Sequence, residues 1–411
     1  MTDYKIISFL LFLTAMLVSS VAYPLVLCFA KRHNIVDNPN ARKLQRVPVP
    51  VLGGVVVYAG VVAGLAVLFM FMKEPVLIWA FLAMTFLMII GIWDDVKDLS
   101  ASLRFLVEIG ILLLFILMTD VYIDSFHGLF GIDNLPPWFG IPFSVFCGVG
   151  IINAVNMIDG VDGYSSGYGM MACLLFALTF HSVWSMRMVG MAVIVSGALL
   201  PFFMHNVFGV RSKMFIGDGG TLMLGMQMVV FAFYALSSRT HCDLLEDMNL
   251  SLPALCLAVL CIPVFDTVRV MFMRILRGKS PFRPDKTHLH HLFIDMGFSH
   301  LGAALGILIV NLAVVGSWFV SWLLGASTDV QVIVVCGLGI LSTFVFYKVM
   351  RAQQNGGPLD EDGYPQGTKL WHSFKYLGFL SHREKGRVWR FIRWMMDSRF
   401  LSRFYLRFLK Y

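Results

Sequence analysis

Apolar runs of roughly 20 residues follow one another along most of the chain, and this succession constrains the fold more than any other feature. A helix rises 1.5 Å per residue, so about 20 apolar residues span the hydrocarbon core of a bilayer. The runs predict eleven transmembrane helices, at roughly 6–29, 51–72, 76–93, 103–119, 138–158, 168–184, 188–208, 214–236, 252–275, 302–324 and 329–349. Charged residues are only 14% of the chain, against about 25% in soluble domains. We therefore expect an all-α polytopic membrane protein and exclude disordered chains, disulfide-stapled secreted domains and ordinary cytosolic enzymes.

Basic residues are concentrated in two odd-numbered loops and in the C-terminal segment, which predicts the orientation of the spans. Five Lys or Arg residues lie within 31–46 and four within 277–286, whereas each even-numbered loop carries at most one. The positive-inside rule then places the odd-numbered loops and the C-terminus in the cytoplasm and the N-terminus outside. A site built on the odd-numbered loops of such an inner-membrane protein would face the cytoplasm.

The C-terminal segment differs in composition from the rest of the chain. From Arg351 to Tyr411 it carries 12 basic and 5 acidic residues, which accounts for the whole net charge of +7. We therefore divide the chain into a transmembrane domain, 1–350, and a cytoplasmic basic, aromatic tail, 351–411. Phe, Trp and Leu interleave with Arg in this tail, which predicts a helix lying on anionic lipid. Nucleic acid is not an expected partner, because no zinc spacing or nucleic-acid module is present.

Acidic side chains stand at the ends of two spans. Asp94 and Asp95 end the third span, where adjacent carboxylates repel each other unless a cation, a proton or a metal-bound phosphate is present. Asp218 lies between glycines at the start of the eighth span, where it could bind a metal or cap the helix. A solvated helix end is the alternative for the first pair, and a plain cap is the alternative for Asp218.

Amides and carboxylates recur every third residue where the fifth span ends, at Asn153, Asn156, Asp159 and Asp162. Such oxygens suit hard cations such as Mg²⁺, and amides also bind a nucleobase or sugar. This loop has no Lys or Arg to pair with its acids. A loop of ordinary turns and caps is the alternative interpretation.

Three histidines cluster after the ninth span. His288, His290 and His291 follow Arg283 and Lys286, and their spacing does not match a zinc site. Histidines beside basic residues indicate a phosphate or sugar-phosphate contact, with a solvated basic loop as the alternative.

Two charged pairs are expected within the spans. Arg104 and Glu108 are four residues apart and Asp266 and Arg269 three apart, so each pair can meet on one helix face. Arg104 could also reach a lipid phosphate.

Together these groups predict one site with acids, amides, histidines and basic residues on the odd-numbered loops. Acids with a divalent cation and basic groups are what phosphoryl transfer requires. A cation-coupled transporter is the alternative, but its acids would lie near the bilayer midplane and not at helix ends.

The chain resembles the polyprenyl-phosphate N-acetylhexosamine-1-phosphate transferases, and within them the undecaprenyl-phosphate N-acetylglucosaminyl branch. The resemblance covers about 37–350. It rests on these motifs: Pro48-Val-Pro50-Val-Leu-Gly53-Gly54, Asp94-Asp95, Asn153-x-x-Asn156-x-x-Asp159-Gly-x-Asp162-Gly, Gly217-Asp218 and Ser280-Pro-Phe-x-Pro-Asp-x-x-His-x-His-His.

The resemblance implies a reaction. UDP-N-acetylglucosamine and undecaprenyl phosphate would give undecaprenyl-diphosphate-N-acetylglucosamine and UMP, the first membrane step of a cell-surface polysaccharide pathway. Mg²⁺ is the implied cofactor, with Mn²⁺ as the alternative. Another UDP-N-acetylhexosamine is the alternative substrate, and a homodimer is compatible with the resemblance.

The resemblance also implies roles for residues. Asp218 would ligate the metal, with Asn156 as a second ligand. Asp94 and Asp95 would serve the lipid phosphate, one of them as a proton acceptor.

The remaining implied roles concern the two substrates. Asn153, Asp159 and Asp162 would bind the nucleotide sugar, with Asp162 near the uracil. The histidines expected to contact the sugar diphosphate are His288, His290 and His291. The basic residues expected at the lipid phosphate are Arg104 and, as weaker candidates, Lys43 and Arg46. Gly220 stands where the family usually has serine, which puts a helix-cap contact in question.

Overall fold

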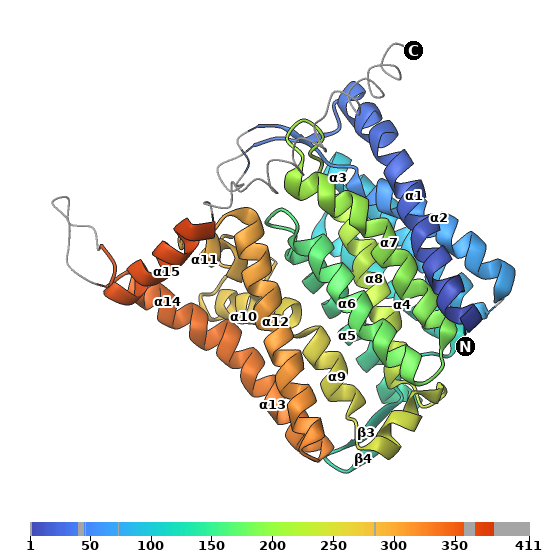
Figure 1. The fold of residues 1–411 in the computed structure, drawn as a ribbon. Coiled ribbons are helices and arrows are strands. Elements are labelled where there is room, and N and C mark those ends of the chain that lie inside the picture. The colour runs from blue at the N-terminus through green and yellow to red at the C-terminus, as the bar shows by residue number, and fades with distance from the viewer. Residues whose placement is uncertain are drawn as a thin grey trace.

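The computed structural model describes residues 2–39, 45, 47–72, 74–282, 285–356 and 366–381. Within them the chain is almost entirely helical, with two short two-stranded sheets. The long helices run side by side, and the C-terminal ones lie to one side of the main bundle (Figure 1). The predicted all-α class is confirmed, apart from these small sheets.

In the described part of the chain, nine helices are long and apolar enough to cross a bilayer. They are α1 (Thr2–Arg32), α2 (Gly53–Phe71), α3 (Pro75–Lys97), α4 (Ala101–Thr119), α5 (Pro137–Met157), α7 (Met186–Phe208), α8 (Gly217–Leu236), α12 (His300–Leu323) and the continuous helix Thr328–Gln354. The last consists of α13 (Thr328–Ile340), a π-helical turn (Leu341–Val345) and α14 (Phe346–Gln354). The predicted sixth span is helix α6 (Tyr164–Ser182). The first turns of α6 are more polar, so it is not among these nine helices. The number eleven for membrane crossings stays a prediction.

The predicted ninth span, 252–275, is not one straight helix, because the helix breaks at Leu260. Its two pieces are α9 (Leu252–Val259) and α10 (Cys261–Leu276), and they meet at 72°. Pro263 has no N–H to donate to the preceding turn, which weakens the helical ladder at this point. Asn311 of α12 satisfies the break: it accepts from Ile262 N (3.0 Å) and donates to the Val259 carbonyl (3.3 Å).

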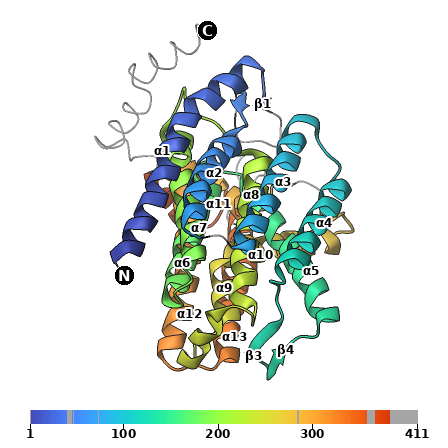
Figure 2. The ribbon, with the colours of Figure 1, turned by 90° about the vertical axis from the view of Figure 1, so that its right-hand side faces the viewer.

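The shorter elements lie at the ends of the bundle. They are β1 (Val36–Asp37) paired with β2 (Val49–Pro50), β3 (Ser125–Leu129) paired with β4 (Ile132–Asn134), the 3-10 helix η1 (His241–Met248), α11 (Leu289–Asp295) and α15 (Lys369–Ser381). Both pairs of strands are antiparallel. β1 lies at one end of the bundle and β3–β4 at the other (Figure 2).

Helix α8 forms the centre of the bundle and is buried along its whole apolar length. Glycines allow α2 and α3 to approach its first turn. A Cβ on Gly54 would lie 2.6 Å from the Gly220 Cα, and one on Gly91 would lie 2.5 Å from the Gly219 Cα. The well-packed core therefore fixes the start of α8, where Asp218 stands, against the ends of two other helices.

The segments that carry the predicted polar clusters lie together at one end of the bundle. The end of α3, the α5–α6 and α7–α8 connections and α11 all line a single cavity there. The prediction that the odd-numbered loops share one face is confirmed. That this face is cytoplasmic stays a prediction.

The predicted division at residue 350 falls within α14, which continues to Gln354. α15 packs back against it: Trp371 is buried, and the Phe374 ring lies 6.1 Å from that of Phe346. Residues 357–365 and 382–411 of the predicted tail are outside the described residues, so its interfacial helix stays a prediction.

Two fully buried glutamines give a matched test of the packing. Gln331 accepts from Ser251 N and Trp318 Nε1 (both 3.1 Å) and donates to the carbonyls of Asn249 and Ala326 (both 2.9 Å). Gln331→Leu removes all four hydrogen bonds, and of these groups the Ala326 carbonyl keeps another bond, from Asn249 Nδ2 (3.1 Å). We therefore expect the substitution to reduce stability by roughly 3 kcal/mol. A lowered midpoint of thermal unfolding in detergent is the measurement.

The control for this prediction is Gln227→Leu. Neither polar atom of Gln227 has a hydrogen-bond partner among the described residues, so a leucine of similar size removes only buried polarity. We expect an unchanged or higher unfolding midpoint. Equal losses in the two variants would contradict the hydrogen-bonding account.

Candidate active site

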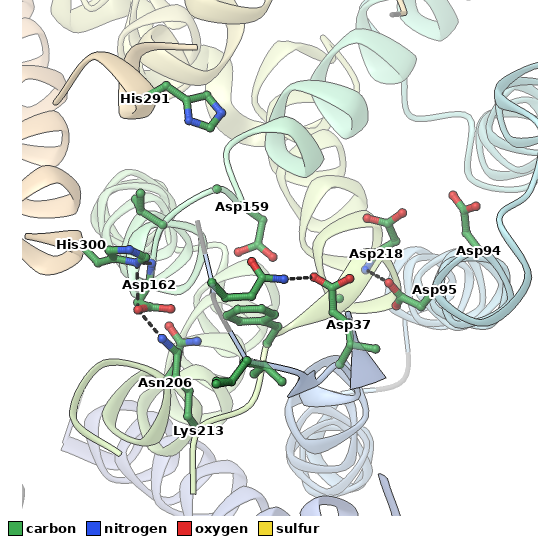
Figure 3. A pocket seen from close by; sticks show the side chains of 18 of the residues that line it. Asp37, Asp94, Asp95, Asp159, Asp162, Asn206, Lys213, Asp218, His291 and His300 are labelled. Atoms are coloured by element: carbon green, nitrogen blue, oxygen red, sulfur yellow. Dashed lines mark hydrogen bonds and ion pairs between the residues drawn. The ribbon is translucent and has the colours of Figure 1, made fainter. Parts of the chain in front are cut away.

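A cavity of about 640 Å³ opens at the end of the bundle where the polar loops meet. Aspartates from several elements line it: Asp37, Asp94, Asp95, Asp98, Asp159, Asp162 and Asp218. Three groups able to carry positive charge also line it: Lys213, His291 and His300. Figure 3 shows these side chains around the same space. A cavity with this excess of carboxylates attracts cations and repels a bare diphosphate.

Asp95 joins α3 to the start of α8. Its carboxylate accepts hydrogen bonds from the backbone N–H groups of Asp218 (3.0 Å) and Gly219 (3.3 Å). The first N–H groups of a helix lack partners within it and carry its positive dipole end, so a carboxylate is stabilised there. The cap of α8 is thus supplied by Asp95, and the Asp218 side chain is left for another role.

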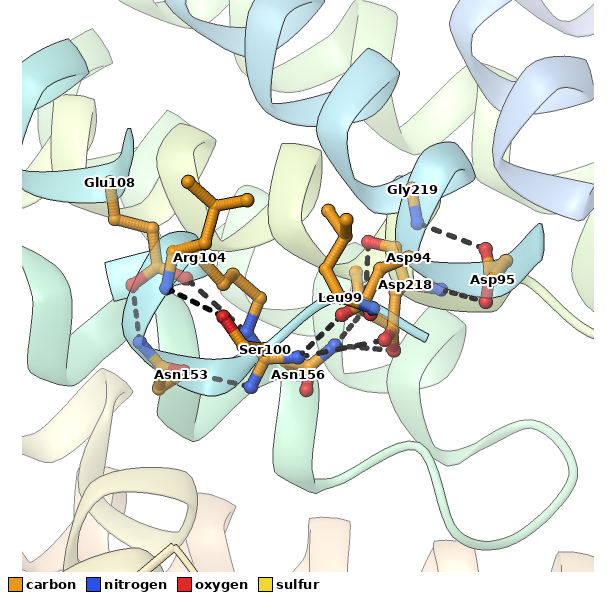
Figure 4. A network of polar contacts seen from close by, with 12 residues as sticks. Asp94, Asp95, Leu99, Ser100, Arg104, Glu108, Asn153, Asn156, Asp218 and Gly219 are labelled. Atoms are coloured by element: carbon orange, nitrogen blue, oxygen red, sulfur yellow. Dashed lines mark hydrogen bonds and ion pairs between the residues drawn. The ribbon is translucent and has the colours of Figure 1, made fainter. Parts of the chain in front are cut away.

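Asp218 lies at the centre of a polar network (Figure 4). Its Oδ1 accepts from Asn156 Nδ2 (2.8 Å), and the same Nδ2 donates to Thr221 Oγ1 (2.8 Å). The Asn156 Oδ1 takes part in none of the hydrogen bonds found among the described residues. Asn156 and Asp218 are therefore in direct contact, and their predicted role as two ligands of one metal stays a prediction.

Arg104 lies between two of the carboxylates. Its Nη1 is 3.0 Å from Asp94 Oδ2 and 3.6 Å from Asp218 Oδ2. Asp94 also accepts from Leu99 N (2.7 Å), which fixes its carboxylate. The predicted pair of Arg104 and Glu108 is present at 3.8 Å, although no hydrogen bond joins them.

Asn153 turns away from the cavity. Its Nδ2 donates to Glu108 Oε2 (2.5 Å) and to the Val149 carbonyl (2.9 Å), and its Oδ1 accepts from Arg104 Nη2 (3.4 Å). Asn153 thus contacts Arg104 and does not line the space where a substrate would lie.

Asp162 occupies the other end of the cavity, where two side chains meet one of its oxygens. Lys213 Nζ lies 2.6 Å and His300 Nδ1 2.9 Å from Asp162 Oδ2. The Phe215 ring lines the cavity here, with Lys213 Nζ 5.6 Å from its centroid. Asn206 Oδ1 accepts from Gly163 N (2.7 Å) and holds the Asp162 loop against α7.

Five of the polar or aromatic lining residues were not predicted from the sequence: Asp37, Asn206, Lys213, Phe215 and His300. Lys213 and Phe215 lie just before Asp218 in the same loop, and that position was the available signal. His300 gave no signal, because its partner Asp162 is 138 residues away along the chain.

The two aspartates of the α5–α6 connection differ in acidity. Burial alone would raise the pKa of Asp162, but the hydrogen bond from His300 and the charges of His300 and Lys213 bring it below its ordinary value. Asp159 is accessible from the cavity yet surrounded by protein, and this burial raises its pKa to about 7. A hydrogen bond from Ser165 (2.6 Å) opposes the rise, and the charge of Asp218 adds to it. Of these two aspartates, Asp159 is therefore the one whose charge changes near neutral pH.

The raised pKa of Asp159 makes a prediction about stability. An ordinary aspartate ionises near pH 4, so between about pH 4 and 7 the folded protein keeps a proton that the unfolded chain has lost. Stability from this group therefore falls as pH rises through that range. We expect Asp159→Asn to raise the unfolding midpoint at pH 8 and to change it little at pH 4.5, measured with EDTA and without substrate. The exposed Asp133→Asn is the control, and an equal effect at both pH values would contradict the assignment.

The three histidines separate in the structure. His291 lines the cavity, whereas His288 is buried and contacts Asp266 Oδ2 through Nδ1 (2.9 Å). His290 is buried against Gly160, where an added Cβ would lie 2.5 Å from its Cε1. Burial, together with the charges of the neighbouring histidines, lowers the pKa of His290 and brings the pKa of His291 to about 4. One neutral imidazole therefore faces the cavity, and the other two support the loop.

The segment before the histidines is held by buried arginines of α10. Arg274 donates to both Asp285 oxygens (3.0 Å each), and Arg269 donates to the Thr287 carbonyl (2.6 Å). The predicted pair of Arg269 and Asp266 is present at 2.6 Å. The remaining basic candidates, Lys43, Arg46 and Arg283, lie outside the described residues.

The donor set near Asp218 fits a hard divalent cation in chemistry. Asp94, Asp95 and Asp218 supply carboxylate oxygens and Asn156 an amide oxygen, which Mg²⁺ prefers over nitrogen or sulfur. Within the described residues, no three His, Cys, Asp or Glu side chains form a ready ligand group. A cation bound there would replace existing contacts of these oxygens, above all the contacts of Arg104 with Asp94 and Asp218.

Helix packing explains why glycine stands at position 220. A Cβ at this position would lie 2.8 Å from the Gly54 Cα and would collide with Ile216. A serine therefore does not fit here unless α2 moves away from α8. The glycine at this position permits the close contact of α2 with α8.

Comparison with known proteins agrees with this geometry. The family model described as glycosyl transferase family 4 matches residues 77–236. The undecaprenyl-phosphate alpha-N-acetylglucosaminyl 1-phosphate transferase of Escherichia coli K12 is 31% identical over 277 residues, covering 66% of this chain and 72% of the relative. The probable undecaprenyl-phosphate N-acetylglucosaminyl 1-phosphate transferase of Bacillus subtilis 168 is 29% identical over 304 residues, covering 73% and 81%. The chain therefore belongs to glycosyl transferase family 4, together with these bacterial transferases.

Proposed function

We propose that this protein transfers N-acetylglucosamine-1-phosphate from UDP-N-acetylglucosamine to undecaprenyl phosphate, with Mg²⁺, and releases UMP. The observation that carries the proposal is the order of groups along one cavity. A polar and aromatic end around Asp162 leads to the carboxylates around Asp218, and Arg104 lies at the edge of those carboxylates. A nucleotide, a metal-bound diphosphate and a second phosphate require these groups in this order.

The nucleotide is proposed to lie at the Asp162 end. Lys213 and His300 both contact Asp162 Oδ2, so Oδ1 is left to accept a hydrogen bond from a nucleobase. The Phe215 ring offers a face for stacking of that base. His291 lines the same cavity and, as a neutral imidazole, would hydrogen-bond to the sugar or its phosphate.

The diphosphate is proposed to lie over Asp218. When bound, Mg²⁺ would offset the negative charge of the diphosphate and of the carboxylates; Asp218 and Asn156 are its proposed ligands. Asp95 keeps the start of α8 in place through its two backbone hydrogen bonds. Asp94 is held by Arg104 and the Leu99 N–H, so its carboxylate is oriented toward the incoming phosphate.

The lipid phosphate is proposed to approach along α4. Leu103 and Leu106, on the same helix as Arg104, are exposed, so α4 presents apolar surface beside the arginine. A polyprenyl chain can lie on such surface while its phosphate reaches the Arg104 guanidinium.

The proposed step is direct displacement. An oxygen of the lipid phosphate forms a bond to the β-phosphorus, and the bond from that phosphorus to the bridging oxygen breaks. UMP leaves with the bridging oxygen, and the sugar stays on the β-phosphate. A proton still on the lipid phosphate would pass to Asp94 or Asp95. The relatives named above act on the same two substrate classes by name, which supports the choice of N-acetylglucosamine.

The proposal includes a location, an inner-membrane protein with the cavity facing the cytoplasm. UDP-sugars are water-soluble and the acceptor is a lipid, so a cavity at the end of a membrane bundle gives both of them access. The basic loops on the same side support this orientation.

The test is UMP release by detergent-purified protein with undecaprenyl phosphate and Mg²⁺. Parallel reactions contain UDP-N-acetylglucosamine, UDP-N-acetylgalactosamine or UDP-glucose. We expect release with UDP-N-acetylglucosamine only, dependent on both lipid and metal. Release with UDP-N-acetylgalactosamine alone would change the sugar and keep the reaction. No release with any of them, from folded protein, would contradict the proposal.

A further inference from the structure

Glu108 is a fully buried carboxylate of α4 that does not line the cavity. A carboxylate inside an apolar helix is costly unless its neighbours compensate for the charge. Its Oε2 accepts from Asn153 Nδ2 at 2.5 Å. Its Oε1 lies 3.8 Å from Arg104 Nε and takes no hydrogen bond among the described residues. The unsatisfied side of this carboxylate therefore faces Arg104.

Each of the three nitrogens of the Arg104 guanidinium lies near an oxygen of another side chain. Nε faces Glu108, and Nη2 donates to Asn153 Oδ1 (3.4 Å). Nη1 alone reaches the cavity carboxylates, at 3.0 Å from Asp94 and 3.6 Å from Asp218. Because the guanidinium is a rigid planar fork, contacts on two corners determine where the third points. Figure 4 shows Glu108 and Asn153 on one side of Arg104 and the aspartates on the other.

The charge balance explains why such a support is needed. Seven aspartates line the cavity, and all of them attract a guanidinium at its edge. Arg104 is on a long flexible side chain, so this attraction alone would draw it among the carboxylates. The Glu108 charge on the opposite side counteracts that attraction and keeps Nη1 at the boundary between the cavity and the apolar surface of α4.

We propose that Glu108, together with Asn153, is a positioning residue that holds Arg104 where it meets the phosphate of the lipid acceptor. The identity of the acceptor as undecaprenyl phosphate rests on the proposed function. The chemistry recognised is a phosphate monoester on a membrane lipid.

The test variant is Glu108→Gln. Glutamine keeps an acceptor for Asn153 and removes the negative charge that faces Arg104 Nε. We expect the Kd for undecaprenyl phosphate, measured without UDP-sugar and without Mg²⁺, to rise about tenfold, the loss of one charged contact. The KM for the lipid should rise equally, while the KM for UDP-N-acetylglucosamine and the unfolding midpoint stay near those of the wild type.

The matched control is Glu74→Gln. Glu74 pairs with Arg187 at 2.9 Å where α3 and α7 begin, at the other end of both helices from the cavity, and we expect no change in either KM. In an Arg104→Gln background, Glu108→Gln should have no further effect on lipid binding, since its target is gone. If Glu108→Gln does not fold, Glu108→Asp withdraws the same carboxylate by one methylene and should weaken lipid binding in the same way.

Two results would overturn the proposal. One is lipid affinity in Glu108→Gln equal to that of the wild type and Glu74→Gln. The other is an equal rise of both KM values with a lowered unfolding midpoint, which would mean a general structural role. Absence of turnover by the wild type would instead overturn the proposed function, and the lipid-binding comparison would still decide the role of Glu108.

Discussion

Asp218→Asn should reduce UMP release by about a thousandfold or more while the protein stays folded and in the membrane fraction. The carboxylate is the proposed metal ligand at the start of α8, and the side chain of Asn156 already contacts it at 2.8 Å. Replacing a carboxylate ligand by an amide removes the negative charge that holds a divalent cation. The bound cation would supply several kcal/mol of transition-state stabilisation, and the variant would lose it. The α8 cap is Asp95, so the substitution leaves the helix start intact. The measurement is turnover at saturating Mg²⁺ and both substrates.

The control is Asp133→Asn on β4, an exposed aspartate at the other end of the bundle. It should keep full activity and the same unfolding midpoint. A second readout separates ligand loss from misfolding: the Kd for Mn²⁺ measured by electron paramagnetic resonance should rise in Asp218→Asn and stay unchanged in Asp133→Asn. Retained turnover by Asp218→Asn would remove the metal assignment.

Gly91→Ala should have the second largest effect, on stability and activity together. A Cβ at Gly91 would lie 2.5 Å from both the Asp218 carbonyl carbon and the Gly219 Cα. These are backbone atoms in a central helix, so α3 must move away, at a cost of roughly 3 kcal/mol. The same movement breaks the two hydrogen bonds from α8 to Asp95. We expect a lower unfolding midpoint and at least about a hundredfold loss of turnover, because catalytic geometry tolerates little displacement.

Gly110→Ala on α4 is the matched control. No atom lies within 4 Å of a Cβ built at Gly110, and alanine favours the helix over glycine by about 1 kcal/mol. This variant should be as stable as the wild type or more so, with unchanged turnover. A Gly91→Ala protein that behaves like Gly110→Ala would contradict the close contact of α3 with α8.

Local patterns in the sequence were sufficient for the helices and for the grouping of the polar loops. A run of about 20 apolar residues can do little other than form a helix in a bilayer, and helices that alternate in direction bring alternate loops together. The approach of Asp94 and Asp95 to Asp218 follows, since α3 ends and α8 begins at the same face. The break at Leu260 was not predicted, because a proline such as Pro263 does not by itself end a helix: Pro24 and Pro201 lie inside α1 and α7. Asn311, which satisfies the break, lies on a different helix.

The parts of the site that depend on pairing between distant segments could not be read from the chain. His300 meets Asp162 only because α12 starts beside the α5–α6 connection. The three histidines are adjacent in sequence, but α11 begins at Leu289 and turns their side chains to different sides, so only His291 reaches the cavity. Gly220 is explained by Gly54 across a helix interface. Tertiary contacts of this kind set side-chain direction, which spacing alone does not give.

The fate of the β-phosphate tests the central claim most directly. Purified protein is incubated with undecaprenyl phosphate, Mg²⁺ and UDP-N-acetylglucosamine that carries ³²P only in the β-phosphate, and lipid is then extracted into butanol. Transfer of the sugar phosphate predicts that the label enters the lipid and that unlabelled UMP stays in water, in equal amounts. Label that remains in water as UDP, with sugar in the lipid, would mean transfer of the sugar alone and would contradict the account.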